Sequence, residues 1–285
     1  MSAISTEIPP VPTAVTVSRP RWVDRIDAMP ARLGATIGVL LIVVIWWIAS
    51  LTLFQASHAI PTPPSVVAYF FDAPAWSNLW SNIQSTLKAA GTGYLYGNLL
   101  AIILAVVVML IPALEELVNQ IAIVSYCIPT VAVAPLIILV ADDPSAASVA
   151  LAALGVFFTT VVGALLGLRA APRTALDVVK AYGGGKWTQL RKVQVISALP
   201  SVLSALKLAA PGAFLGTVLA EYLGSGGDST LGKALLNAQF ASDAPQLWYL
   251  ALVSGGVAGI AYFIVGLIGR VTTPWASGSA TTGGR

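Results

Sequence analysis

The sequence predicts an all-α, polytopic membrane protein with six transmembrane helices. Of its 285 residues, 57% are hydrophobic and only 9% are charged, and the mean hydropathy is +0.84. A soluble domain carries roughly one quarter charged residues, with which it covers its surface. The apolar residues also gather into runs near or above the roughly 20 residues that cross a hydrocarbon core. The core of this protein is therefore expected within a bilayer.

The first predicted span covers residues 33–54, which carry no charge. The following stretch, from residue 58 to 76, contains four prolines, which break helices, and a group of aromatic residues that suit the boundary between water and lipid. This stretch is expected to be an interfacial loop with short helical pieces.

The second span is predicted over 85–111 and the third over 117–140. Because Pro129 and Pro135 cannot donate backbone hydrogen bonds, the third span is expected to be a kinked or broken helix that faces protein. The fourth span, 145–168, begins after Pro144.

The last two spans are predicted over 199–223 and 246–268, and the loop between them is long enough for a short helix. Before the fourth span, Asp142 and Asp143 are expected to form a solvated helix start, where carboxylates cap the first backbone N–H groups. The single histidine, His58, has no second ligand nearby in the sequence, so no metal site is expected.

The positive charges predict the orientation. With the N-terminus inside, the inner segments hold twelve Lys and Arg residues and the outer loops hold one, Lys233. Inner loops of membrane proteins are enriched in Lys and Arg. Both termini are therefore expected in the cytoplasm, with residues 1–32 as a tail, 33–270 as the transmembrane domain and 271–285 as a disordered tail.

The segment 173–197 is predicted to be a cytoplasmic hairpin. Two short helices, 174–182 and 186–196, flank Gly183 to Gly185, which allow a sharp reversal with positive φ. The second helix has apolar residues to bury: Trp187, Leu190 and Val193. It also has basic residues to present to water, acidic protein or lipid headgroups: Lys186, Arg191 and Lys192. From the residues alone, an ordinary amphipathic interfacial loop is the alternative interpretation.

This hairpin resembles the EAA loop of permeases in binding-protein-dependent ATP-binding-cassette (ABC) importers, whose pattern is Glu-Ala-Ala, three residues, Gly, then about nine residues to Ile-x-Leu-Pro. Asp177, Val178 and Val179 stand at the Glu-Ala-Ala positions, Gly183 at the glycine, and Val193, Val195 and Ile196 at the closing Ile, Leu and Pro. The segments IPTPPSVV, IPTVAVAPL and LAEYLG are similar to those of the branch that imports aliphatic sulfonates, taurine, nitrate or thiamine-precursor pyrimidines.

The resemblance implies a type I ABC importer permease fold in a bacterial inner membrane. In that family the hairpin is a coupling helix that docks on the ATPase, and the residues that correspond here are Asp177, Val178, Val179, Tyr182, Gly183, Gly184, Lys186 and Trp187. Two valines replace the small alanines of the family pattern. This difference suggests that the chain pairs with a second, non-identical permease.

The partners implied by the resemblance are a dimer of ABC ATPase subunits, a second permease and an extracytoplasmic binding protein that delivers a small organic or anionic solute; nucleic acid is not among them. The chain has no Gly-x-x-x-x-Gly-Lys-Ser/Thr phosphate loop and no set of nucleophile, base and orienting residue. It is therefore not expected to be an enzyme or to bind a cofactor, and ATP and Mg²⁺ are expected on the partner ATPase.

Polar, proline and glycine residues within the spans are candidates for the translocation pathway, and these are Ser125, Pro129, Pro135, Pro211, Gly212 and Glu221. A charge at membrane depth faces a partner or a watery cavity. Glu221 is thus either part of a gate or solute route, or an interfacial carboxylate bonded to loop backbone. As alternatives to an importer subunit, six spans also permit an ion-coupled secondary carrier or a non-transport membrane scaffold.

Overall fold

The computed structural model describes residues 30–55, 59–71, 73–141 and 143–275. The chain divides into two units, residues 1–56 and 57–285, which are described separately. In the first unit, the described residues 30–55 form one helix, α2 (Ala31–Thr52). Its apolar part begins at Leu33 and is 20 residues long, which corresponds to about 30 Å of helix and suffices to cross a bilayer.

The second unit is built from helices, and its described residues contain no strand. Its elements in chain order are α3 (Pro63–Ala68), the 3₁₀ turn η1 (Tyr69–Phe71), α4 (Ala73–Leu110), the 3₁₀ turn η2 (Pro112–Leu114), α5 (Glu115–Cys127), α6 (Thr130–Val140), α7 (Pro144–Arg169), α8 (Arg173–Ala181), α9 (Lys186–Gln189), the π-helical segment η3 (Leu190–Gln194), α10 (Val195–Tyr222), α11 (Leu231–Phe240) and α12 (Ala244–Thr272).

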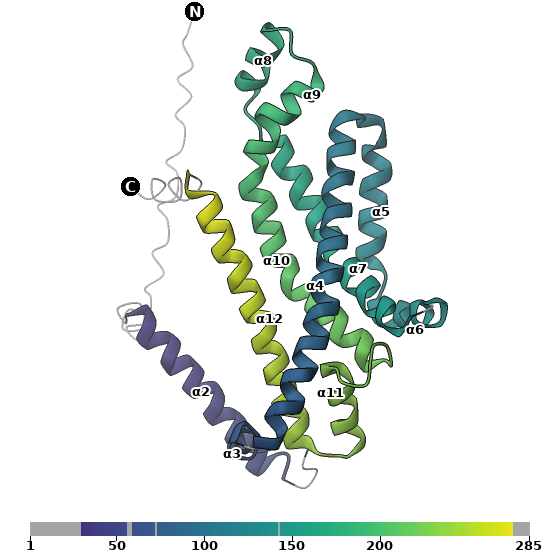
Figure 1. Ribbon diagram of the computed structural model, residues 1–285. Coiled ribbons are helices and arrows are strands. Elements are labelled where there is room, and N and C mark those ends of the chain that lie inside the picture. The colour runs from purple at the N-terminus through teal and green to yellow at the C-terminus, as the bar shows by residue number, and fades with distance from the viewer. Residues whose placement is uncertain (1–29, 56–58, 72, 142, 276–285) are drawn as a thin grey trace, which may run out of the picture. The chain divides into compact units, whose positions relative to one another are not determined.

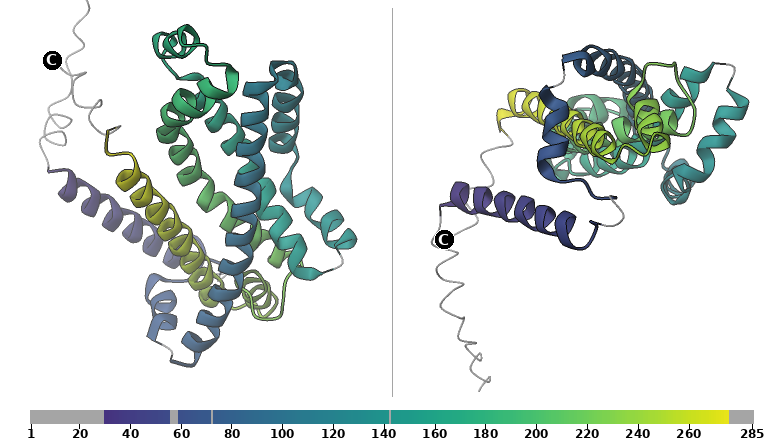
Figure 2. Two further views of the ribbon diagram at one scale, coloured as in Figure 1. Left: turned by 45° about the horizontal axis from the view of Figure 1, so that its top comes forward. Right: turned by 90° about the horizontal axis from the view of Figure 1, so that it is seen from below.

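Five helices of the described chain are long and apolar enough to cross a membrane: α2, α4, α7, the continuous helix 186–222 and α12. The pair formed by 112–127 and 130–140 is a sixth candidate span, bent by 97° at its break. The break lies at Pro129, which has an extended backbone conformation, and α6 projects sideways from the bundle (Figure 2). A broken third span was predicted, and the structure confirms it.

Small residues let the three central helices approach one another closely. Between α7 and α10, a Cβ added at Gly163 would lie 2.3 Å from the Cβ of Ala205, and one added at Gly216 would lie 2.9 Å from the carbonyl oxygen of Leu151. Between α4 and α7, a Cβ at Gly97 would lie 2.6 Å from the carbonyl oxygen of Ala153. In a bilayer, helices associate through such close packing rather than through the hydrophobic effect.

Buried polar side chains cross-link the same helices. The side-chain oxygen of Asn98 in α4 accepts a hydrogen bond from the hydroxyl of Thr160 in α7, and both residues are buried. The hydroxyl of Tyr94 donates to the carbonyl oxygen of Leu206 in α10, at 3.0 Å. Without water in the bilayer core, such groups must find partners inside the protein.

The second unit has two ends. At the hairpin end lie α8, α9, the turn between α4 and α5, and the last residues of α12; at the α11 end lie α3, α11 and the first residues of α7 (Figure 1). Glu115 and Arg169 form an ion pair at 2.6 Å at the hairpin end. The Lys and Arg residues of this end are Arg169, Arg173, Lys180, Lys186, Arg191, Lys192, Arg270 and Lys207, which lines a pocket together with Arg270, whereas Lys233 lies at the other end.

Three predicted boundaries were wrong. The second span was predicted to begin at residue 85, but α4 begins at Ala73, because polar residues that end an apolar run do not end a helix. The hairpin's second helix and the fifth span were predicted as separate elements, yet residues 186–222 form one helix that passes through Pro200 and Pro211. Membrane helices tolerate proline, because neighbouring helices and local π adjustments satisfy the freed backbone groups. The last span continues to Thr272, two residues into the predicted tail.

Candidate functional site

The hairpin is closed by glycines at the end of α8. The Gly183 N–H donates to the carbonyl oxygen of Lys180 at 2.9 Å, and the Gly184 N–H donates to that of Val179 at 2.8 Å. This pair of bonds is a Schellman motif, which requires a left-handed residue directly after the helix. Gly183 supplies it with a φ of +78°. The reversal with positive φ was predicted at these glycines, and it occurs at the first of them.

The second limb of the hairpin is anchored in the hydrophobic core between the helices. Leu190, at the start of the π-helical segment, is only 2% exposed. It belongs to a cluster that includes Val118 of α5 and Leu165 of α7. Since residues 186–222 form one helix, a displacement of the hairpin passes into α10 without an intervening loop. Single π turns inside α-helices occur frequently at functional sites.

Apolar side chains are exposed at the far end of the hairpin. Val178 is 57% exposed, Tyr182 90% and Trp187 60%, and we call these three residues the hairpin tip. Trp187 and Leu190 were both predicted to have apolar area to bury. Within the chain only Leu190 is buried, because α9 projects beyond the ends of the neighbouring helices (Figure 1). Large exposed apolar groups among polar ones mark interaction surfaces.

The remaining hairpin candidates surround the tip. Asp177 and Lys180 form an exposed ion pair at 3.6 Å, and Lys186 is exposed beside Trp187. Val179 is half-buried over the glycine turn. The structure therefore brings the eight residues predicted for coupling into one small hairpin; their role in coupling stays a prediction.

Gly184→Ala is expected to loosen this hairpin. An added Cβ at Gly184 would lie 2.4 Å from Cγ1 of Val179 and 2.7 Å from its carbonyl oxygen, whereas nothing lies within 4 Å of one added at Gly185. Overpacking of this kind costs about 1–3 kcal/mol. Amide hydrogen exchange of α8 in the full chain should accelerate about tenfold or more in Gly184→Ala and stay unchanged in Gly185→Ala. Equal exchange in the two variants would show that the turn is not tightly packed.

At the opposite end of α10, Glu221 holds the start of α11. Its side chain is 1% exposed. Its Oε2 accepts hydrogen bonds from the hydroxyl of Thr86 at 2.8 Å and from the Gly232 N–H at 3.1 Å. The Thr86 hydroxyl in turn accepts from the Leu231 N–H at 3.0 Å. We call these four residues the Glu221 junction. Glu221 is bonded to backbone, as its second interpretation expected, but at the first turn of α11 rather than in a loop; contact with solute stays a prediction.

The aspartates before α7 are only partly described. Asp143 accepts a hydrogen bond from the Ser145 N–H at 3.0 Å and so caps α7, as predicted. Hydrogen bonds from the side chain and the backbone N–H of Ser145 hold the pKa of Asp143 below its usual value. Asp142 and His58 lie outside the described residues.

The other pathway candidates are dispersed over three helices. Ser125 in α5 donates to the carbonyl oxygen of Ala122 at 2.7 Å. Pro129 lies at the break before α6, and Pro135 lies inside α6 without ending it. Pro211 and Gly212 lie in α10, where Gly212 faces Gly155 of α7 across the close helix crossing. The structure does not assemble these residues with Glu221 into one site.

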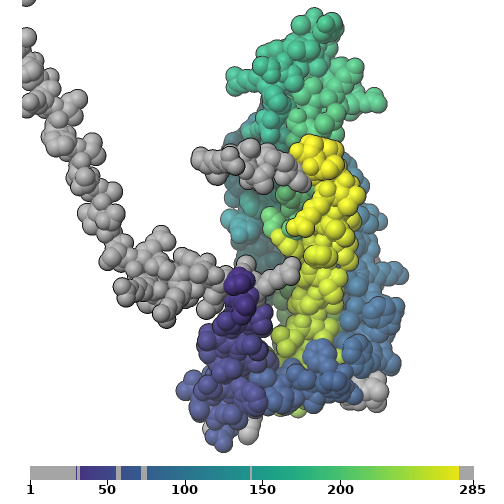
Figure 3. Space-filling view, turned by 90° about the vertical axis from the view of Figure 1, so that its left-hand side faces the viewer, coloured from purple at the N-terminus to yellow at the C-terminus, as the bar shows by residue number. Residues whose placement is uncertain are grey.

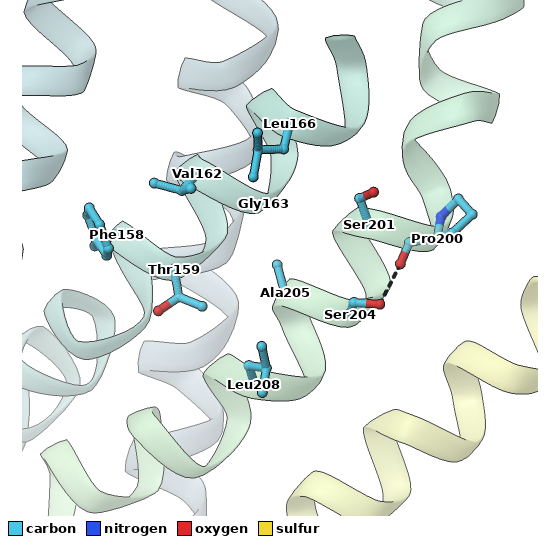
Figure 4. A pocket seen from close by; sticks show the side chains of 10 residues that line it. All are labelled: Phe158, Thr159, Val162, Gly163, Leu166, Pro200, Ser201, Ser204, Ala205 and Leu208. Carbon is cyan, nitrogen blue, oxygen red and sulfur yellow. Dashed lines mark hydrogen bonds between the residues drawn. The ribbon is translucent and has the colours of Figure 1, made fainter. Parts of the chain in front are cut away.

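A groove of about 490 Å³ lies between α7 and α10. Phe158, Thr159, Val162 and Leu166 line it from α7, and Pro200, Ser201, Ser204 and Leu208 line it from α10 (Figure 4). The Ser204 hydroxyl donates to the carbonyl oxygen of Pro200 at 2.8 Å. Hydroxyl groups on an otherwise apolar wall suit either a neighbouring helix or a solute with hydrogen-bonding groups. Sequence reasoning missed this groove, because its walls are far apart in the chain.

Comparisons with known proteins place this architecture among transport components. Residues 97–275 match the model of the family described as "Binding-protein-dependent transport system inner membrane component". The riboflavin transport system permease protein RibX of Chloroflexus aurantiacus is 30% identical over 241 residues, which cover 83% of this chain and 88% of that protein. The putative aliphatic sulfonates transport permease protein SsuC of Bacillus subtilis is 28% identical over 148 residues, or 52% and 53% of the two chains.

A shorter match and a solved structure agree with these relatives. The formylaminopyrimidine transport permease protein ThiX of Halalkalibacterium halodurans is 31% identical over 111 residues, which cover 39% of this chain and 44% of that protein. A chain from the crystal structure of a bacterial ABC transporter involved in the import of alginate superposes with a TM-score of 0.58 at 13% identity. This superposition covers 89% of the present chain and all of that one. At this identity the superposition shows a shared fold.

Proposed function

Because the chain belongs to the family of binding-protein-dependent transport system inner membrane components, we propose that its hairpin tip docks on a separate ATPase subunit. In this family the chain is a membrane-spanning permease subunit of an ABC importer. The observation that carries the proposal is the exposure of Val178, Tyr182 and Trp187 on a rigid hairpin. Family membership also favours the permease over a secondary carrier or a scaffold.

The hairpin suits the transmission of force between two proteins. Its tip offers aromatic side chains, which dominate the energy of protein interfaces, and the exposed cation of Lys186 beside them. Its base is fixed by Leu190, in the hydrophobic core that it shares with α4, α5 and α7, and by the helix that continues into α10. A movement imposed on the tip is thus carried into the membrane rather than absorbed by a loop.

The double variant Tyr182→Ser/Trp187→Ser tests the proposal. In the complex reconstituted with its ATPase, we expect ATP-dependent uptake and co-purification of the ATPase to fall about 30-fold or more, because each buried aromatic contributes about 2 kcal/mol or more at an interface. The matched control, Tyr182→Phe/Trp187→Phe, keeps an aromatic ring at each position and should retain both. Normal uptake by the serine variant would refute docking through the tip.

The orientation and the partners follow from the same premise. The excess of Lys and Arg at the hairpin end supports a cytoplasmic hairpin. The chain then lies in a bacterial inner membrane with both termini on the cytoplasmic side. ATP and Mg²⁺ then belong to the ATPase dimer on that side. An extracytoplasmic binding protein is assigned to the α11 end, where it delivers the solute.

The relatives support a small organic or anionic solute, since they are named as permeases for riboflavin, aliphatic sulfonates and formylaminopyrimidine. The solute of this chain can be identified through the ligand that its binding protein carries. In the reconstituted complex, the ligand that the cognate binding protein carries should stimulate ATP hydrolysis, and unrelated ligands should not.

A second, non-identical permease is proposed as the membrane partner. Val178 and Val179 stand where the family pattern has small alanines, and Tyr182 adds further bulk at the tip. This bulk suits an asymmetric complex in which the partner carries the typical loop. A fully active complex formed by two copies of this chain and the ATPase would refute the heterodimer.

A further inference from the structure

Two cations meet in a pocket between α10 and α12 at the hairpin end. The pocket has a volume of about 200 Å³ and is lined by Lys207 of α10 and Arg270 of α12, together with Ser204, Gly266, Gly269 and Thr273. The hairpin and the groove described above do not include these cations. α12 is exposed along much of its length on one face of the second unit, where it appears in yellow (Figure 3).

A glycine of α12 leaves room for the side chain of Lys207. A Cβ added at Gly266 would lie 2.8 Å from Cε and 3.3 Å from Nζ of Lys207, so the glycine makes room for the lysine side chain. The Lys207 ammonium lies 4.2 Å from the centre of the Tyr262 ring, within the range of a cation–π contact. The Lys207 ammonium is therefore held against α12 rather than extended into solvent.

No carboxylate among the described residues neutralises these two cations. The acidic side chains of the hairpin end have other partners: Glu115 pairs with Arg169, Glu116 with Gln120, and Asp177 with Lys180. A cation at membrane depth is costly and calls for a negative counterpart. The pocket thus offers two positive charges to an anion that the described residues do not supply.

We propose that this pocket binds the phosphate group of an anionic phospholipid. Basic pockets between membrane helices, at the level of the headgroups, bind lipids of this class. The exposed apolar residues of α12 beside the pocket, Phe263, Leu267 and Val271 among them, supply the surface on which acyl chains lie. A bound lipid would tie α12 to α10, the helix that continues into the hairpin. A phospholipid and free inorganic phosphate would present the same phosphate group to the pocket. Only the phospholipid would also contact α12 through its acyl chains.

Native mass spectrometry of the full chain in neutral detergent tests the proposal, with short-chain phosphatidylglycerol, phosphatidylcholine and inorganic phosphate as probes. Phosphatidylglycerol should bind with one tight site and phosphatidylcholine at least tenfold more weakly. Lys207→Gln and Arg270→Gln should each weaken phosphatidylglycerol about fivefold, since a basic residue near the membrane surface contributes about 1 kcal/mol. Lys207→Arg keeps the charge and should bind normally, and Lys180→Gln, at the exposed hairpin, is the matched control.

The opposing outcomes are distinct. Equal binding of the two lipids, or equal binding by the two pocket variants and Lys180→Gln, would overturn the proposal. Displacement of phosphatidylglycerol by millimolar inorganic phosphate would assign the pocket to a free anion instead. If Lys207→Gln fails to fold, Arg270→Gln still decides, because Arg270 is an exposed residue near the end of α12.

Discussion

Glu221→Ala is expected to destabilise the protein by about 2–4 kcal/mol, measured as the free energy of unfolding in mixed micelles. The carboxylate is buried and accepts hydrogen bonds from the Thr86 hydroxyl and the Gly232 N–H. Its removal leaves both donors without this acceptor in a site from which water is excluded, and an unsatisfied buried polar group costs about 1–3 kcal/mol. The loss should concentrate at α11, whose first turn is held by these bonds.

Two variants separate this effect from a simple loss of packing. Glu221→Gln keeps a side-chain oxygen that can accept both bonds, so it should lose less than half as much stability as Glu221→Ala. Thr86→Val removes the hydroxyl, and the double variant Glu221→Ala/Thr86→Val should be more stable than the sum of the two changes predicts, because the residues share one network. Additive losses would show that Glu221 and Thr86 act independently.

The sequence was sufficient to locate the helices that are uniformly apolar. The predicted spans 33–54 and 145–168 agree with α2 and α7 to within two residues at each end. The break in the third span was predicted because proline lacks a backbone donor, and it lies at Pro129. Hydropathy failed at the start of α4, where polar and aromatic residues continue a helix that the apolar run does not mark.

The candidate sites were predictable only where they are local in sequence. The Schellman turn at Gly183 depends on neighbouring residues and was visible in the glycine run. The Glu221 junction joins Thr86 to a residue 135 positions later, and Lys207 meets Tyr262 from another helix. Such pairs depend on helix packing, which a single sequence does not reveal. The same reason explains why Leu190, rather than Trp187, fastens the hairpin to the core.

Leu190→Ala is expected to uncouple ATP hydrolysis from uptake. Leu190 is the buried residue that packs the second limb of the hairpin against the core of α4, α5 and α7, and truncation of a buried leucine costs about 2–5 kcal/mol with a cavity left behind. The tip would still dock on the ATPase, but the looser packing at position 190 would absorb its movement instead of passing it into α10. In the reconstituted complex, we expect uptake to fall about tenfold or more while co-purification of the ATPase stays near normal.

This pattern is the opposite of that expected for the hairpin tip, where binding of the ATPase and uptake are lost together, so the two sets of variants distinguish docking from transmission. Leu190→Met conserves the volume and should couple normally. Val195→Ala, a partly exposed position on the same helix, controls for the loss of methyl groups. Normal uptake by Leu190→Ala would mean that force reaches α10 through the continuous helix alone; lost co-purification would mean that Leu190 shapes the docking surface rather than its base.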